Sequence, residues 1–238
     1  MSARRIVLWD IDHTLVDTRG VGREFSAEAF KKTTGVPMRQ QAKVDGITES
    51  VIFRETAKLH GLTTDRSDFE RFAEALAETH RARSAELRER GYALPGAAVA
   101  LDALAELPGV VQTVLTGNVR QVARIKMELF GLDRHVTWPI GAFGEDDDVR
   151  AELVRIALGR ASFEFGEPAT PANAILIGDT PADVEAGQEA GVTVIAVASG
   201  RSSVDDLRRA GADHVLPSLV DTASLIALVN NDGKRPSG

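Results

Sequence analysis

Residues Ile6–Thr14 read IVLWDIDHT, a short apolar run that ends in two aspartates. The run Ile6–Trp9 is rich in β-branched side chains, which is typical of a buried strand. Asp10 and Asp12 follow at once, although buried anions are costly unless a partner stabilises them. Residues two apart on an extended chain point to the same side. We therefore expect the two carboxylates either to face one cation or substrate, or to belong to an acidic loop after the strand.

The composition sets limits on the class of protein. The chain has 238 residues, 43% of them hydrophobic, which is enough to bury a core in one large or two small domains. It has no cysteine, which excludes disulfides, thiolate metal sites and cysteine nucleophiles. A net charge of −7 argues against nucleic-acid binding. No apolar run is long enough to cross a bilayer, and the N-terminus leads into a strand rather than a signal-peptide region. We expect a cytoplasmic monomer or homodimer that binds no membrane.

Two kinds of periodicity divide the chain. Between about Gly22 and Arg90 the apolar residues recur at helical spacing, which predicts helices at Arg23–Thr33, Glu49–His60 and Ser67–Arg90. Elsewhere short apolar strands alternate with helices; the strands are Ile6–Trp9, Val110–Leu115, Ala174–Ile177, Thr193–Ala198 and Asp213–Leu216. This alternation predicts an α/β fold in which a Rossmann-like parallel sheet carries helices on both faces. The expected division is a core of residues 1–19 and 94–230, a helical insert of residues 20–93 and a disordered tail, residues 231–238.

Polar residues follow three of these strands. They are Asp10 and Asp12, then Thr116, Gly117 and Asn118, then Asp179 and, one helical turn later, Asp183. Taken singly, Thr116 could simply open a helix and Asp179 could cap one. Ligands of parallel sheets bind at the carboxyl ends of the strands, where all these residues are expected to meet. Their joint placement favours a shared site.

In order and spacing, these residues resemble the motifs of the haloacid dehalogenase-like (HAD) hydrolase superfamily. Asp10-x-Asp12-x-Thr14 resembles the first motif, Thr116-Gly117-Asn118 the second, and Gly178-Asp179-x-x-x-Asp183 the fourth. The helical insert lies where family members with a helical (C1-type) cap carry that cap. The resemblance implies an α/β core with an inserted all-helical cap domain, related to phosphoglycolate phosphatases and β-phosphoglucomutases.

The resemblance also implies roles in catalysis. Asp10 would attack phosphorus and form an aspartyl-phosphate. Asp12 would protonate the leaving alcohol and then activate water, and its presence argues against the dehalogenase branch. Thr116, with the amides of Gly117 and Asn118 at a helix start, would hold the phosphoryl oxygens.

A magnesium site is implied by the same resemblance. Asp10, Asp179 and the backbone carbonyl of Asp12 would bind Mg²⁺ through oxygen ligands, and Asp183 would support that site either by contacting these ligands or through water.

The third family motif, usually a lysine, has no match in this chain. The corresponding segment, Glu145–Glu152, reads EDDDVRAE. Arg150 is the candidate for the cation that balances Asp10 and the phosphate; the alternative is a solvated arginine at a helix start. Lys126 is the rival, expected to be an ordinary surface lysine in mid-helix. The acidic run itself is expected to form a solvated loop.

Three residues are candidates for contact with the substrate at or near the cap. The segment Val44–Glu49 resembles the turn between cap helices that faces the active site in capped relatives, and Gly46 in it would allow close backbone approach. Thr48 would either touch the substrate or cap the following helix, and Arg19 would meet a substrate anion or only water.

The function expected from these features is Mg²⁺-dependent hydrolysis of a small phosphorylated metabolite, as in phosphoglycolate phosphatases. One alternative is a β-phosphoglucomutase-like phosphotransferase, which shares all the motifs. Another, of a different class, is a non-catalytic binding or regulatory protein on the same fold.

Overall fold

A five-stranded parallel sheet forms the centre of the molecule. The computed structural model describes residues 4–44 and 46–230, so the predicted tail, residues 231–238, lies outside the described residues. The strands are β1 (Arg5–Trp9), β4 (Val110–Val114), β5 (Ala174–Gly178), β6 (Thr193–Val197) and β7 (His214–Leu216), in the order β4-β1-β5-β6-β7. Trp9 of β1 lies opposite Val114 of β4 and Ile177 of β5. The neighbouring strands β4, β1 and β5 therefore end at the same level, where the polar residues follow them.

Helices cover both faces of this sheet, and side chains alternate between the two faces along β1. The helices of this part are α5 (Ala97–Ala105), α6 (Arg120–Leu129), α7 (Arg150–Phe165), α8 (Pro181–Ala190), α9 (Val204–Arg209) and α10 (Thr222–Asn230). Val7 and Trp9 join the hydrophobic cluster beneath α5, α6 and α10, whereas Ile6 and Leu8 join the cluster beneath α7 and α8. This alternation is the pattern of a strand buried on both sides. The predicted α/β fold with a Rossmann-like parallel sheet is confirmed.

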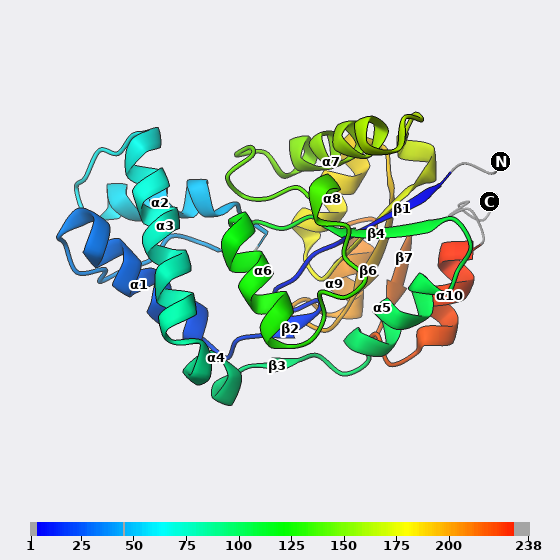
Figure 1. The fold of residues 1–238 in the computed structure, drawn as a ribbon, viewed down its shortest axis with the longest axis horizontal. Coiled ribbons are helices and arrows are strands. Elements are labelled where there is room, and N and C mark those ends of the chain that lie inside the picture. Colours follow the sequence, from blue (N-terminus) through cyan, green and yellow to red (C-terminus); the bar gives the residue numbers. More distant parts are fainter. Residues whose placement is uncertain (1–3, 45, 231–238) are drawn as a thin grey trace.

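Between Val16–Asp17 (β2) and Tyr92–Ala93 (β3), the described residues form four helices: α1 (Val21–Thr34), α2 (Glu49–Leu59), α3 (Arg66–Ala82) and α4 (Ser84–Arg90). They lie together beyond the end of the sheet that is opposite the N-terminus (Figure 1). Phe25, Phe30, Phe53 and Phe72 are buried among them, and Val122 of α6 packs into the same cluster. The helical insert therefore has a core of its own that also contacts the α/β part.

The prediction of one helix over Ser67–Arg90 is wrong, because two helices meet at Arg83. The backbone of Arg83 leaves helical geometry there, with ψ at 25°. Its guanidinium lies 4.7 Å from the ring centre of Phe25 and donates to Glu28 at 2.7 Å, both on α1. Contacts to residues at least 55 positions earlier in the chain accompany this break, and local spacing could not reveal them.

The two connections between the sheet and the helical insert run side by side. Val16–Asp17 (β2) pairs antiparallel with Tyr92–Ala93 (β3), so that Val16 lies opposite Ala93. The chain therefore leaves and re-enters the α/β part at one place, next to Asp10 and Asp12. Among the described residues, no helix combines the length and apolar character needed to span a membrane.

Candidate active site

Asp10 directly follows β1 and lies at the floor of a cavity. Its main-chain N–H continues the sheet by donating to the Ile177 carbonyl at 2.9 Å, and the residue is only 6% exposed. Immediately beyond it the chain turns sharply, with His13 at a positive φ of 61°. A cavity of about 620 Å³ opens over this turn and is lined by Asp10, Asp12 and Asp179 from the sheet and by residues of the helical insert.

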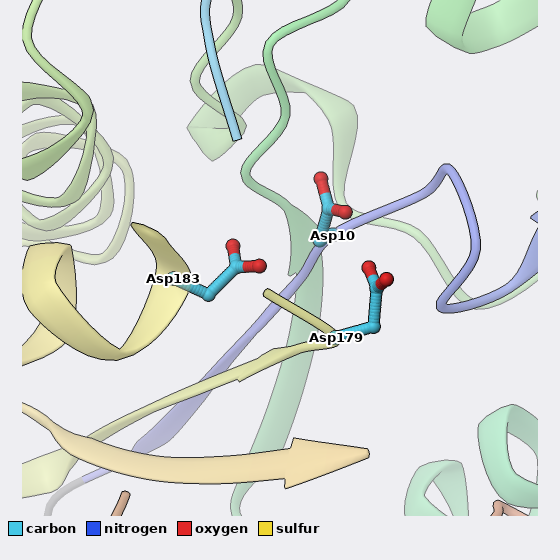
Figure 2. A group of neighbouring side chains, drawn as sticks. All are labelled: Asp10, Asp179 and Asp183. Carbon is cyan, nitrogen blue, oxygen red and sulfur yellow. The ribbon is translucent and has the colours of Figure 1, made fainter. Parts of the chain in front are cut away.

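Three carboxylates meet at this place. One oxygen from each of Asp10, Asp179 and Asp183 lies within 4.8 Å of the others, and all three residues are buried (Figure 2). Burial raises the pKa of Asp10; Arg150 opposes that rise, and the neighbouring charge of Asp183 adds to it. Burial likewise raises the pKa of Asp179, and the charges of Asp10 and Asp183 add to it. Crowded anions of this kind are stabilised by a divalent cation, so the donor set fits Mg²⁺.

Asp183 is held differently from the other two. Its Oδ2 accepts from the Thr180 amide at 3.0 Å and from the Thr180 hydroxyl at 2.6 Å, in a capping box that begins α8. Its Oδ1 accepts from Arg150 Nε at 2.9 Å and Nη2 at 2.5 Å. Because both oxygens already have donors, Asp183 is placed to orient Arg150 and add negative charge rather than to bind a metal directly.

Arg150 lies at the start of α7 and is buried at 8% exposure. Its Nη2 donates to Asp10 Oδ1 at 2.8 Å as well as to Asp183. Burial acts to lower the pKa of this guanidinium, but the charges of Asp183 and Asp10 outweigh it and raise that pKa. The arginine is therefore a fixed cation on Asp10, and the alternative of a solvated arginine does not hold.

Lys126 is not a surface lysine, and that expectation is wrong. Its side chain is 6% exposed, and Nζ donates to both oxygens of Asp12, at 2.7 and 2.8 Å, and to Asn118 Oδ1 at 2.8 Å. Burial acts to raise the pKa of Asp12, but the charge and hydrogen bonds of Lys126, with the Asn118 amide, hold that pKa below its ordinary value. Each of the two aspartates of the first motif thus has its own buried cation.

The expected phosphate-binding residues lie beside these carboxylates. Thr116 is 1% exposed, and its Oγ1 accepts from the Asn118 amide N–H at 3.2 Å and from the Asn118 side chain at 2.8 Å. Asn118 Nδ2 also donates to Asp12 Oδ2 at 2.7 Å. One expectation here is wrong: Gly117 and Asn118 do not start the helix, because α6 begins at Arg120.

The acidic run before α7 is bonded throughout rather than simply solvated. Glu145 accepts from the Arg120 amide at 2.9 Å and so caps α6. Asp146 pairs with Arg160 at 2.7 Å. Asp148 accepts from Ser50 and Arg54 of α2, each at 2.6 Å. The run therefore joins α6, α7 and the helical insert around the cavity.

Of the three expected cap contacts, two line the cavity and one does not. Gly46 lines it, with φ at 69°, and a Cβ there would lie 2.2 Å from the Cβ of Ala182, so this close approach requires glycine. Arg19 lines it too, with its guanidinium 4.8 Å from the ring centre of Tyr92. The expectation that Thr48 touches the substrate is not supported among the residues that line the cavity: its hydroxyl contacts Ser50 and the Asp148 carbonyl. Thr48 occupies the N-cap position of α2 without a side-chain cap bond.

Four further residues at the site carry no assignment from the sequence. Thr14 donates to Asp179 Oδ1 at 3.1 Å. A Cβ on Gly200 would lie 1.8 Å from Asp179 Oδ2, so only glycine fits there. Glu49 and His80 of the helical insert line the cavity. Thr14 is part of the first motif and could have been found from it; the others depend on long-range contacts.

Comparison with known proteins identifies the family. A model described as haloacid dehalogenase-like hydrolase matches residues 7–188, which include every site residue named for the core except Gly200. The chain belongs to this hydrolase family. A search of curated proteins finds no match.

Solved structures show the same fold at low sequence identity. A hydrolase from Pseudomonas syringae is 20% identical with a TM-score of 0.67, over 95% of this chain and 99% of the other. A predicted phosphatase from Clostridium acetobutylicum is 17% identical with a TM-score of 0.65, over 95% and 100%. A predicted phosphoglycolate phosphatase from Haemophilus somnus is 16% identical with a TM-score of 0.63, over 95% and 99%. At these identities the similarity concerns the fold.

Proposed function

We propose that this HAD hydrolase is a Mg²⁺-dependent phosphomonoesterase that acts on a small phosphorylated molecule through an aspartyl-phosphate on Asp10. One observation carries the proposal: Asp10 lies on the cavity floor between a buried arginine and two further buried aspartates. Three buried carboxylates beside one guanidinium leave a net negative charge, which is costly in a purely structural role. It is suited to hold a metal and an anionic phosphate against one nucleophilic carboxylate.

In the first step Asp10 attacks phosphorus, and the cations around it balance the negative charge. Asp10 Oδ1 accepts from Arg150, which leaves Oδ2 to form the bond to phosphorus while the bond to the leaving oxygen breaks. A Mg²⁺ held by Asp10 and Asp179 would neutralise phosphate charge during this transfer. Arg150 keeps the guanidinium charge next to the reacting carboxylate, where it stabilises the negative charge of the transition state.

Asp12 would act first as the general acid and then as the general base. The arriving phosphate dianion raises the pKa of Asp12, against the effect of Lys126, and favours the acid that protonates the leaving alcohol. Once the alcohol has left, Asp12 is a carboxylate beside Lys126 and can take a proton from the water that attacks the aspartyl-phosphate. Asn118 holds Oδ2 of Asp12 in this position.

The test is phosphate release from a panel of phosphomonoesters, with and without Mg²⁺, by the wild-type protein and by Asp10→Asn. We expect Mg²⁺-dependent release that the Asn variant loses by at least about 10³-fold while unfolding at a similar temperature. Activity near the wild-type level in an Asp10→Asn sample free of contaminating phosphatase contradicts the covalent mechanism. Interconversion of sugar phosphates without release of phosphate would instead favour the phosphotransferase.

A further inference from the structure

Glu49 is fixed directly above the phosphate-binding loop. It is the first residue of α2, and its main-chain N–H donates to the Gly117 carbonyl at 2.8 Å. This bond joins the helical insert to the second motif. The side chain of Glu49 therefore starts from a point next to the catalytic carboxylates.

The Glu49 carboxylate lines the cavity and has no hydrogen bond or ion pair within the part of the chain that the structure describes. Burial raises its pKa to about 7; Lys126 opposes this rise, and Asp12 adds to it. Lys126 cannot supply a donor, because its ammonium group already bonds Asp12 and Asn118.

A position at the start of α2 does not explain this carboxylate. A negative charge in the first turn of an exposed helix gains about 0.3–1 kcal/mol from the helix dipole. Glu49 is only partly buried and opens to the cavity, so water can solvate its carboxylate before a substrate binds. A substrate that displaces this water without offering a donor leaves the carboxylate unsatisfied, which costs about 1–3 kcal/mol and more for a charged group. The carboxylate therefore favours a substrate that provides a hydrogen-bond donor in place of the water.

His80 also lines this cavity and adds no positive charge to it. Its Nδ1 lies 2.8 Å from the Leu76 carbonyl, so Nδ1–H donates and Nε2 carries a lone pair. Nε2 is buried without a partner among the described residues. Burial, with the charge of Lys126, lowers the pKa of His80 to about 4, so the ring is neutral and offers no positive charge to a substrate anion.

We propose that Glu49 selects the organic part of the substrate: the preferred phosphomonoester carries an ammonium or hydroxyl group that donates a hydrogen bond to this carboxylate, and an ester with a carboxylate there is disfavoured. The inference rests on the proposed phosphomonoesterase function. It separates this chain from phosphatases whose substrate carries a carboxylate in place of such a donor.

The experiment compares esters that share a short carbon chain. With Mg²⁺, kcat/KM is measured for 2-aminoethyl phosphate, 2-hydroxyethyl phosphate, carboxymethyl phosphate and p-nitrophenyl phosphate. We expect the wild type to prefer the amino and hydroxy esters over the carboxymethyl ester by at least about tenfold. In Glu49→Gln the ratio of amino to carboxymethyl ester should fall by about tenfold, because the amide has no charge and can donate to a carboxylate. A larger fall for the amino than for the hydroxy ester identifies ammonium as the preferred donor.

Glu55→Gln is the matched control, since Glu55 lies on the same helix and pairs on the surface with Lys58. It should leave all ratios unchanged. A wild type that prefers the carboxymethyl ester, or a Glu49→Gln variant with an unchanged ratio, overturns the inference while the phosphomonoesterase function stands. If Glu49→Gln lowers the melting temperature and slows all four esters equally, Glu49 is structural and the inference is wrong. No hydrolysis of any ester by the wild type refutes the proposed function and, with it, this selection.

Discussion

Replacing Lys126 with methionine tests whether Asp12 depends on its own buried cation. The Lys126 Nζ–Asp12 Oδ1 distance of 2.7 Å corresponds to about 6 kcal/mol of attraction at an effective dielectric constant of about 20. Desolvation of the two charges offsets much of this, and breaking a buried pair typically costs about 3–5 kcal/mol. Because the Asp12 side chain is 37% exposed to the cavity, water can replace part of the contact, and we expect a loss of about 2–3 kcal/mol in the free energy of unfolding.

The expected effect on activity follows from what remains around Asp12. Acid–base catalysis is worth about 10²–10⁴-fold, and Asn118 would still hold one oxygen of Asp12 in the variant. We therefore expect kcat/KM for an alkyl phosphate to fall by about 30- to 100-fold. The fall should be smaller for p-nitrophenyl phosphate, whose leaving group needs little protonation.

A double-mutant cycle separates this role from a general loss of structure. In an Asp12→Asn background, Lys126→Met should cost less than about threefold, because the group that it positions is gone. Arg124→Met, an exposed change on the same helix, serves as the control and should leave kcat/KM unchanged. Equal losses from Lys126→Met in both backgrounds, or for both leaving groups, would refute the assignment. Stability is followed by urea unfolding.

Three further outcomes are expected. Arg150→Lys should lower kcat for phosphate release by at least about tenfold, since an ammonium group cannot reproduce the forked contact to Asp10 and Asp183; wild-type kcat in steady-state assays would contradict this. Asp148→Asn should raise KM about threefold to fivefold with little change in kcat, because it weakens the partly exposed contact between this loop and α2; an unchanged KM in the same assays counts against it. His80 has a pKa of about 4 in the fold against about 6.5 unfolded, so the unfolded state binds more protons between these values and stability falls as pH drops. Protonation of this residue alone should lower the free energy of unfolding by about 2 kcal/mol between pH 7.5 and pH 5. Urea unfolding of His80→Phe should show a decrease over the same pH range that is smaller by this amount.

The sequence predicted those parts of the fold that depend on local pattern. Ile6–Trp9 is apolar throughout because the strand is buried on both faces, and the aspartates after it lie at the level where β4 and β5 also end. The break at Arg83 and the short strands β2 and β3 were missed, because each depends on partners far along the chain. Two-residue strands also carry too little periodicity to recognise.

In the site, the burial of Lys126 could have been predicted from the sequence of α6, but its partner could not. Val122, Ala123 and Met127 of α6 are buried, and at helical spacing they place Lys126 on the same apolar face. A lysine on such a face must reach a partner, which argues for a buried ion pair rather than a surface position. Which carboxylate it reaches could not be read from the sequence, because Asp12 is more than a hundred residues away.

Glu49 illustrates where inference from the sequence stops. Its place at the start of a helix is predictable from the pattern, and an acidic residue there is ordinary for a helix on the surface. What distinguishes it is that its main-chain N–H donates to the Gly117 carbonyl and that its carboxylate lines a cavity in which none of the described residues donates to it. Both facts arise from the packing of the helical insert against the sheet. The residues that we propose to break the phosphate ester could therefore be found from sequence motifs, whereas the proposed choice of ester depends on how the helical insert packs against the sheet.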